Sequence, residues 1–164
     1  MVLPIKMTDS SDPDVQEILA VHKAWFDSNE DLVVEKMTPN FADPGYYQFN
    51  LNGHTYTSLH EKATLWDNLH AVGVSLANMT IVQEPLVYVE GNLAYLLAVW
   101  GCDVTVEDET KVPDDIGRWR GLDTPATFRV TEVYRKDDGR GNPVWKIWHF
   151  HASPIADPTS SRLA

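Results

Sequence analysis

Apolar residues recur at every third or fourth position in the N-terminal part of the chain, and this spacing predicts amphipathic helices. The clearest stripe covers 13–27. Asp12 offers an N-cap for it, and Pro13 suits the first helical position because its missing amide hydrogen would have no partner there. Ser28 and Asn29 favour local hydrogen bonds over helix continuation, so the helix is expected to end before them.

Two further helices are predicted before the long strands begin. A short one covers 31–37, and a longer one starts after Ser58 and ends near Gly73. Ser58 and Glu61 have the spacing of a capping box, in which two side chains satisfy amides of the first turn. Gly73 can adopt the left-handed conformation that commonly closes a helix.

The remaining sequence is rich in β-branched and aromatic residues that alternate with polar ones, which predicts strands. A short hairpin is expected first, with a turn at 50–53 between 41–49 and 54–56. Pro85 cannot donate to a sheet ladder and therefore requires an edge strand or a bulge. The four long strands expected are 79–89, 93–106, 126–135 and 144–153.

Helices followed by an antiparallel meander form an α+β arrangement. The apolar face of the sheet must be buried, and the amphipathic helices are available to cover it. We therefore predict a cone-shaped, curved antiparallel sheet wrapped around the N-terminal helices, with a central pocket. One domain is expected over 13–154, with a flexible arm at 1–12 and a flexible tail at 155–164. The polar stretch 107–125 is long for a hairpin loop, which favours a functional role.

Charge and composition argue against several classes of partner. The 164 residues include 13 Lys and Arg against 24 Asp and Glu, a net charge of −11. This surplus disfavours nucleic acid and anionic membranes, since both are bound through clustered cations. Cys102 is the single cysteine, and no signal peptide or long apolar run is recognisable, so a cytoplasmic location is expected. No glycine-rich phosphate loop occurs, and no cofactor is predicted.

Two segments near the C-terminus, joined by an Asp138-Gly139 turn, carry a recognisable pattern: Phe-Arg-Val-Thr-Glu-Val-Tyr at 128–134 and Val-Trp-Lys-Ile-Trp-His-Phe-His-Ala-Ser at 144–153. This pattern resembles the C-terminal signature of the nuclear transport factor 2-like (NTF2-like) superfamily, in its SnoaL-like branch. It is also similar to the association (hub) domain of calcium/calmodulin-dependent protein kinase II, which ends in a comparable His-Phe-His-x-Ser run. Upstream residues that follow the same order as in that hub are Asp43-Pro44-Gly45, Phe49, Gly53, His60 and Asn68-Leu69.

The resemblance spans about 13–154. It implies a cone-shaped α+β barrel, usually dimeric through the outer face of the sheet, with a pocket between the sheet and the helices. The superfamily includes ketosteroid isomerase, scytalone dehydratase, limonene epoxide hydrolase, polyketide cyclases and a diarylpropane lyase, together with members that catalyse no reaction. The fold alone therefore leaves the function open.

Alternation along the last two strands indicates which side chains face the pocket. His149 and His151 share one face, and we expect it to point inward because Lys146 on the opposite face favours solvent. Glu132 shares its face with apolar residues, and a buried carboxyl group suits a general acid or base near neutral pH. The resemblance places an arginine of the hub at this position, so the glutamate favours proton transfer over binding of a carboxylate.

Four further residues are candidates for chemistry. Asp43 and His60 match the hub-like order of residues, and one of Tyr46 and Tyr47 should face inward, where its hydroxyl could polarise a substrate oxygen. Each candidate also has an ordinary structural explanation: Asp43 can initiate a turn, a strand-end histidine can be a hydrogen-bonded structural group, and Glu132 can pair with an arginine at the rim. The aromatic side chains expected to form the pocket wall are Trp66, Trp100, Phe128 and Tyr134.

Two other chemistries have less support. His149 and His151 could bind a metal together with His60 or Asp43, but no HExxH or paired-cysteine motif accompanies them, and no metal is predicted. Cys102 could act as a nucleophile but lacks any local signature of one.

The sequence therefore predicts a cofactor-independent acid–base enzyme that acts on a small hydrophobic, aromatic or polycyclic compound. A lyase, a dehydratase and an isomerase all fit, with a lyase preferred, and retro-aldol cleavage of a C–C bond is among its possible reactions. The alternative is a non-catalytic ligand-binding or oligomeric assembly module with the same fold. A homodimer or a higher homo-oligomer is expected.

Overall fold

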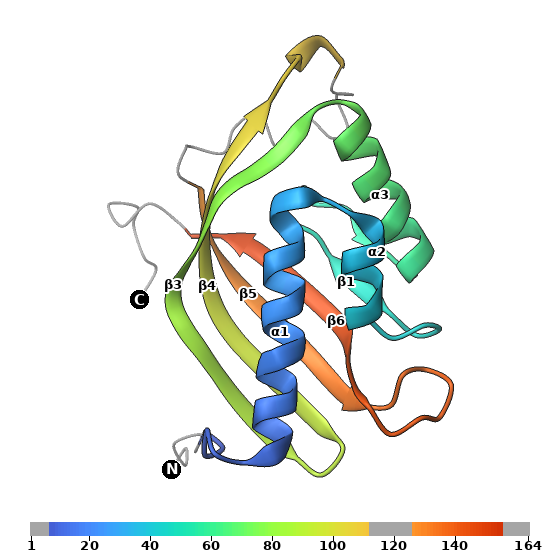
Figure 1. Ribbon diagram of the computed structural model, residues 1–164, viewed down its shortest axis with the longest axis vertical. Helices are drawn as coiled ribbons and strands as arrows, with labels where there is room; N and C mark the ends of the chain where they lie inside the picture. Colours follow the sequence, from blue (N-terminus) through green and yellow to red (C-terminus); the bar gives the residue numbers. More distant parts are fainter. Residues whose placement is uncertain (1–6, 112–125, 156–164) are drawn as a thin grey trace, which may run out of the picture.

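The computed structural model describes residues 7–111 and 126–155. Figure 1 shows three helices that precede the four long strands. The helices are α1 (Pro13–Asp31), α2 (Val34–Met37) and α3 (Leu59–Ala71), with short 3₁₀ turns η1 (Thr38–Asn40) and η2 (Glu109–Lys111). The strands are β1 (Tyr47–Phe49), β2 (Thr55–Tyr56), β3 (Val74–Glu90), β4 (Leu93–Val106), β5 (Ala126–Lys136) and β6 (Trp145–Pro154). Much of the expected arm, tail and polar stretch (1–6, 156–164 and 112–125) lies outside the described residues.

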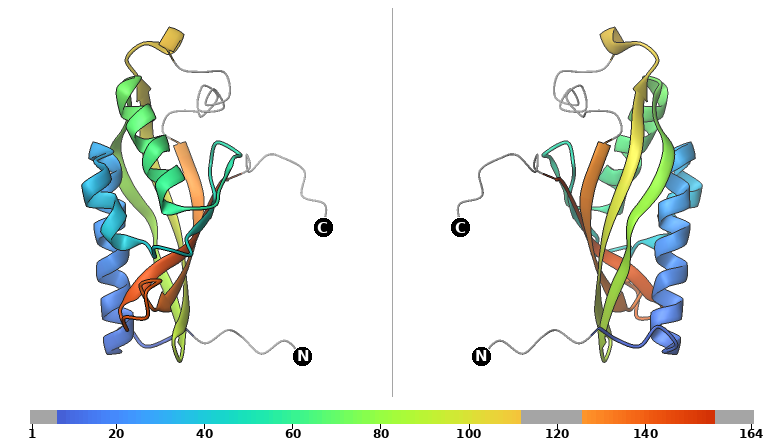
Figure 2. Two further views of the ribbon diagram at one scale, coloured as in Figure 1. Left: turned by 90° about the vertical axis from the view of Figure 1, so that its right-hand side faces the viewer. Right: turned by 90° about the vertical axis from the view of Figure 1, so that its left-hand side faces the viewer.

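The strands form one sheet in the order β2-β1-β6-β5-β4-β3. Neighbouring strands are antiparallel except β1 and β6, which run parallel. The sheet is curved, and the helices lie against one of its faces (Figure 2). The predicted α+β cone is thus confirmed, with one difference. The sheet is mixed because short β1 joins it beside the last strand of the chain.

α1 begins where the sequence predicts but ends later. Oδ1 of Asp12 caps the first amides, the nearer at 2.9 Å. The prediction that the helix ends before Ser28 is wrong, since α1 continues through Ser28 and Asn29 to Asp31. Both side chains instead donate to the carbonyl oxygen of Trp25, at 2.7 and 2.8 Å. Their polar groups are therefore satisfied without interrupting the helix.

α3 begins at the predicted capping box. Oγ of Ser58 accepts a hydrogen bond from the amide of Glu61 at 3.2 Å, and the Glu61 carboxylate accepts one from the amide of Thr57 at 2.6 Å. The side chains that α3 buries are Lys62, Leu65, Trp66 and Leu69. Their spacing is that of one helix face, so a lysine occupies a position where an apolar residue is usual.

β3 is longer than predicted and irregular. It starts at Val74 rather than Met79, and its register against β4 shifts between Gln83 and Leu86. Pro85 lies within this shift, as expected for a residue that has no amide hydrogen to donate.

A bulge in β6 decides which of its residues face the interior. Trp148 is an extra residue opposite β5, and one extra residue reverses the alternation of side chains. Ile147 is buried before the bulge, and Phe150 is buried after it. His149 and His151 consequently face outward.

The core between the helices and the sheet is strongly aromatic. The ring of Trp25 lies at its centre, and its centroid is 5.0 Å from that of Phe41, 5.3 Å from Phe150, 5.4 Å from Trp66 and 6.0 Å from Trp100. Edge-to-face and tilted pairs of this kind add to the stability that burial provides. Much of the aromatic content of the chain is therefore used in packing.

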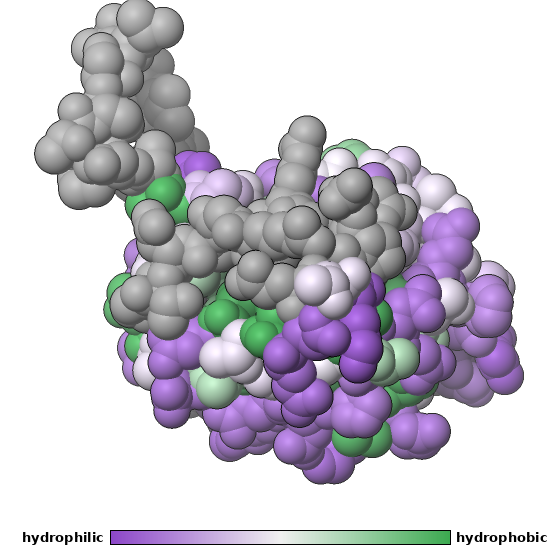
Figure 3. Space-filling model, turned by 90° about the horizontal axis from the view of Figure 1, so that it is seen from above, coloured by the Kyte–Doolittle hydropathy of each residue, from purple (hydrophilic) through white to green (hydrophobic). Residues whose placement is uncertain are grey.

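The surface contrasts with this core. On the face seen from above, the coloured residues are mostly hydrophilic, and groups of apolar side chains lie between them (Figure 3). Within 7–111 and 126–155, no helix is long and apolar enough to span a membrane.

Candidate functional site

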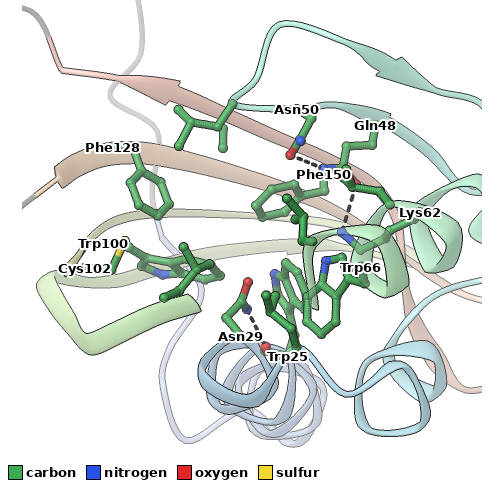
Figure 4. A pocket seen from close by; sticks show the side chains of 16 residues that line it. Trp25, Asn29, Gln48, Asn50, Lys62, Trp66, Trp100, Cys102, Phe128 and Phe150 are labelled. Atoms are coloured by element: carbon green, nitrogen blue, oxygen red, sulfur yellow. Dashed lines mark hydrogen bonds between the residues drawn. The ribbon is translucent and has the colours of Figure 1, made fainter. Parts of the chain in front are cut away.

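A cavity lies between α1, α3 and the inner face of the sheet (Figure 4). Its free space is about 40 Å³, which holds a few water molecules. Aromatic walls come from Trp25, Trp66, Trp100, Phe128 and Phe150, and polar groups come from Asn29, Gln48, Asn50 and Lys62. An apolar chamber with a few polar groups is typical of a small-molecule site, although this one is narrow.

Of these four polar residues, Lys62 is the one that can carry a charge, and it is only 1% exposed. Its Nζ donates a hydrogen bond to Oε1 of Gln48 at 2.8 Å and lies 4.3 Å from the ring centroid of Trp25. Burial lowers the pKa of Lys62 well below its ordinary value, and the negative charge of Glu132 opposes this with a smaller effect. Burial therefore makes Lys62 easier to deprotonate than an ordinary lysine, and the neutral amine carries a free lone pair.

Tyr46, Gln48 and Asn50 form a hydrogen-bonded row along β1. The hydroxyl of Tyr46 donates to Oε1 of Gln48 at 2.6 Å, and Nε2 of Gln48 donates to Oδ1 of Asn50 at 2.6 Å. Burial, and secondly the charge of Glu132, raises the pKa of Tyr46 well above its ordinary value. The tyrosine thus stays protonated and continues to donate, which fixes the amide oxygen that also accepts from Lys62.

A second polar network lies behind the aromatic wall. Oε2 of the fully buried Glu132 accepts a hydrogen bond from the Tyr134 hydroxyl and lies 3.0 Å from Nδ1 of His22. Burial, and secondly the charge of Glu132, raises the pKa of Tyr134 well above its ordinary value. The ring of His22 packs 5.5 Å from that of Trp100, a wall residue. These three side chains support the wall and contribute a buried negative charge, but they do not line the cavity.

Three buried donors on the cavity wall have no hydrogen-bond partner within the described ranges: Nε1 of Trp25, Nε1 of Trp100 and Nδ2 of Asn50. They come from α1, β4 and the segment after β1, and the three side chains lie on different sides of the cavity (Figure 4). An unmet buried donor costs about 1–3 kcal/mol. A ligand oxygen that accepts from one of these donors would remove the cost for that donor, so the cavity suits a molecule with an oxygen on an apolar body.

Six of the predicted site residues are buried on the inner side of the protein: Tyr46, Trp66, Trp100, Phe128, Glu132 and Tyr134. Of these, Trp66, Trp100 and Phe128 line the cavity. Tyr46 is the member of the tyrosine pair that faces inward, and it contacts Gln48 rather than the open space. Glu132 is buried as expected but is hydrogen-bonded within the second network.

The prediction that His149 and His151 point into the pocket is wrong. The bulge at Trp148 turns both to the outer face, where Phe49 packs 5.3 Å from the ring of His149 and 5.9 Å from that of His151. Nδ1 of His149 lies 3.0 Å from the carbonyl oxygen of Tyr47. Partial burial lowers the pKa of His149, with the backbone contact to Tyr47 opposing it.

Asp43, Tyr47 and His60 also lie away from the cavity. Asp43 is exposed before β1, and its Oδ2 accepts from Arg140 at 3.2 Å. Tyr47 is 41% exposed on the outer face because its neighbour Tyr46 takes the inward position. His60 is exposed in the first turn of α3 and lines a separate surface cleft, since the inward face of that helix begins at Lys62.

Two of the residues that the sequence patterns did not identify share one signal. Lys62 and His22 are polar residues on otherwise apolar helix stripes, and both are buried. A polar residue at such a position must either reach solvent or find partners inside. Gln48 and Asn50 give no comparable signal, because β1 is too short for its alternation to be recognised.

Comparison with known proteins addresses the fold. No family model and no curated protein matches the sequence. The structure matches an NTF2-like superfamily protein from Salmonella enterica serovar Typhimurium with a TM-score of 0.67 and 18% identity, over 87% of this chain and 92% of that chain. It matches a ketosteroid isomerase-like protein from Erwinia carotovora atroseptica with a TM-score of 0.66 and 14% identity, over 89% and 99%. The chain has the NTF2-like fold.

A further structural neighbour is a candidate calcium/calmodulin-dependent kinase II association domain from Exiguobacterium sibiricum, with a TM-score of 0.63 and 10% identity over 92% of this chain and 99% of that chain. The fold predicted from the resemblance is thus confirmed. The structural matches establish the NTF2-like architecture. Because the identities are this low, the chemistry must be argued from the residues of this cavity.

Metal binding finds no support in the described part of the chain. No group of three or more His, Cys, Asp or Glu residues there is arranged to hold an ion. Cys102 lines the cavity, but burial raises the pKa of its thiol to about 11, which disfavours the reactive thiolate.

Proposed function

We propose that this protein is a cofactor-independent acid–base enzyme whose substrate is a small carbonyl compound with an apolar body. The observation that carries the proposal is the buried amine of Lys62, which lines an apolar cavity together with unpartnered N–H donors. A neutral amine removes a proton from the carbon next to a carbonyl, and the donors stabilise the enolate oxygen that develops.

Each polar side chain has a role in this proposal. Lys62 is the proton acceptor, and Gln48 holds its nitrogen in place. Trp25, Trp100 and Asn50 each offer a donor for a substrate oxygen, from different sides of the cavity. Glu132 acts at longer range, because its negative charge raises the pKa of Lys62 and so limits the effect of burial.

Isomerases, dehydratases and retro-aldol lyases all use an enolate of this kind, and a lyase that cleaves a C–C bond is our preferred assignment. The ketosteroid isomerase-like neighbour supports the general class. The free space of about 40 Å³ supports a substrate no larger than one aromatic ring, smaller than the polycyclic compounds that the sequence also admits. Even one ring requires wall side chains to move.

Proton exchange tests the proposal. Small aromatic aldehydes, ketones and β-hydroxy ketones are incubated with the protein in heavy water, and loss of the hydrogen next to the carbonyl, or release of an aldehyde, is followed by NMR. We expect exchange with the unmodified protein and with Lys23→Met, a change on the exposed side of α1. We expect none with Lys62→Met. Equal exchange by both variants would refute the role of Lys62.

We also propose that the protein forms a homodimer through the outer face of the sheet. A cross-strand row on that face runs from Leu97 through Thr131 and His151 to Phe49. Phe49 is 46% exposed and Leu97 is 36% exposed, so the row presents apolar surface to solvent. The association-domain neighbour supports assembly in general.

A further inference from the structure

The amine of Lys62 is enclosed by aromatic rings. Their centroids lie between 4.3 and 5.8 Å from Nζ, and the rings belong to Trp25, Phe41, Tyr46, Trp66 and Phe150. The rings exclude water and offer no strong acceptor. The hydrogen bond to Gln48 is therefore the one polar side-chain contact of Nζ within the described residues.

Gln48 also orients the amine. Its Oε1 accepts from both Lys62 and Tyr46, at 2.8 and 2.6 Å, which uses both lone pairs of that oxygen. A neutral amine has two hydrogens and one lone pair. With one hydrogen held by Gln48, the lone pair is left for a ligand in the cavity that Lys62 lines.

We propose that Lys62 is a covalent nucleophile that forms an imine with an aldehyde or ketone held in the cavity. The proposal rests on the proposed function, because it requires the cavity to admit a carbonyl compound. One of the unpartnered donors of the cavity wall, from Trp25, Trp100 or Asn50, holds the carbonyl oxygen while the amine attacks the carbon. A desolvated lysine in an apolar pocket is a recognised form of activated nucleophile.

The covalent step balances without an oxidant, a reductant or a cofactor. The nitrogen lone pair forms a C–N bond to the carbonyl carbon, and the π electrons of C=O move to the oxygen. The oxygen takes both hydrogens of the amine in turn and leaves as water, while a C=N bond forms. Amine and carbonyl thus give imine and water. Water protonates the imine, which then accepts the electrons of the adjacent C–C bond of a β-hydroxy compound. The hydroxyl proton passes to the hydroxide left by that protonation, an aldehyde leaves and an enamine remains on Lys62, which suits the preferred lyase reaction.

Reductive trapping on the unmodified protein tests the imine. The protein is incubated at neutral pH with acetaldehyde or with benzaldehyde, and sodium borohydride is added to reduce any imine to a stable secondary amine. Intact mass counts the adducts, and peptide mapping locates them. Each unit by which a pKa falls raises the neutral fraction of an amine about tenfold. We therefore expect Lys62 to be labelled about tenfold faster, or more, than the exposed Lys23 and Lys36.

A pH series adds a readout that a purely structural lysine would not give. Labelling of Lys62 should persist at a lower pH than labelling of Lys23, and Lys62→Met should lose that adduct alone. Uniform labelling of the lysines, or labelling that spares Lys62, would overturn the proposal. If the protein catalyses proton exchange but forms no adduct at Lys62, then Lys62 acts as a base and the imine is refuted. An adduct without exchange or cleavage would support the imine and refute the proposed function.

Discussion

Lys62 and Glu132 are buried in the same core, yet they form no ion pair with each other. Nζ of Lys62 donates to Gln48 at 2.8 Å, while the Glu132 carboxylate accepts from Tyr134 and lies 3.0 Å from His22. The charge of Glu132 still acts on Lys62, because it opposes the lowering of the Lys62 pKa that burial causes. The negative charge of Glu132 therefore limits how far burial lowers the pKa of Lys62.

Glu132→Gln should shift the pH dependence of the reaction downward. Removing a nearby negative charge removes an effect that raises the pKa of Lys62, so the neutral amine persists at a lower pH. The measurement is the pH profile of proton exchange, or of reductive trapping if exchange is slow. Glu35→Gln, at an exposed position of α2, is the control and should leave the profile unchanged. A shift to higher pH would contradict the coupling.

Lys62→Met should stabilise the fold at neutral pH while abolishing activity. Because burial holds the pKa of Lys62 below the value of about 10.4 in the unfolded chain, the unfolded state binds more protons over that interval. Lys62 thus costs stability at neutral pH, and the cost shrinks as pH rises towards the unfolded value. We expect a gain of about 1 kcal/mol in the free energy of unfolding by urea.

The control for that prediction is the pH dependence of the difference in free energy of unfolding between Lys62→Met and the unmodified protein. The advantage of Lys62→Met should decrease as the pH is raised to about 10. An advantage that stays constant would mean that the methionine acts through packing alone.

Tyr134→Phe should destabilise the protein by about 1.5–3 kcal/mol, because it removes a hydroxyl that donates to the buried carboxylate of Glu132. Urea unfolding measures the loss. Tyr95→Phe is a matched change on the outer face, where the Tyr95 ring stacks on Tyr88, and it should have a smaller effect. If the two changes cost the same, the buried network contributes nothing specific.

Much of the fold follows from local signals, but the inward residues of β6 do not. The cap at Asp12, the capping box at Ser58 and the irregularity at Pro85 are each set by neighbours in sequence. The bulge at Trp148 depends on how β6 pairs with β5, and the alternation of apolar and polar residues along β6 does not predict it. One extra residue therefore placed His149 on the opposite face from the predicted one.

The candidate site was only partly predictable for a related reason. Trp66, Trp100 and Phe128 line the cavity because large apolar side chains on inward faces must lie either in the core or on a cavity wall. Lys62 was missed because its residue type favours solvent, and the helix stripe alone does not reveal that aromatic rings and Gln48 enclose the amine. The parallel pairing that brings Gln48 to the cavity joins β1 and β6, which are far apart in sequence.

Leu97→Glu should weaken or abolish the proposed dimer while the fold is kept. Leu97 lies in the exposed row of the outer face, and a charge there is tolerated in a monomer but costly inside an apolar interface. Sedimentation of the unmodified protein and of the variant measures the mass in solution. An unmodified protein that is monomeric at micromolar concentration would refute the dimer.

The protonation of Lys62 can be measured directly by NMR of protein labelled with carbon-13 and nitrogen-15 in its lysines, with Lys62→Met used to assign the signal. We expect the Lys62 side chain to show the shifts of a neutral amine at neutral pH and to titrate well below the exposed lysines. A Lys62 signal that titrates with the others, near the ordinary value of about 10.4, would contradict both the proposed base and the proposed nucleophile.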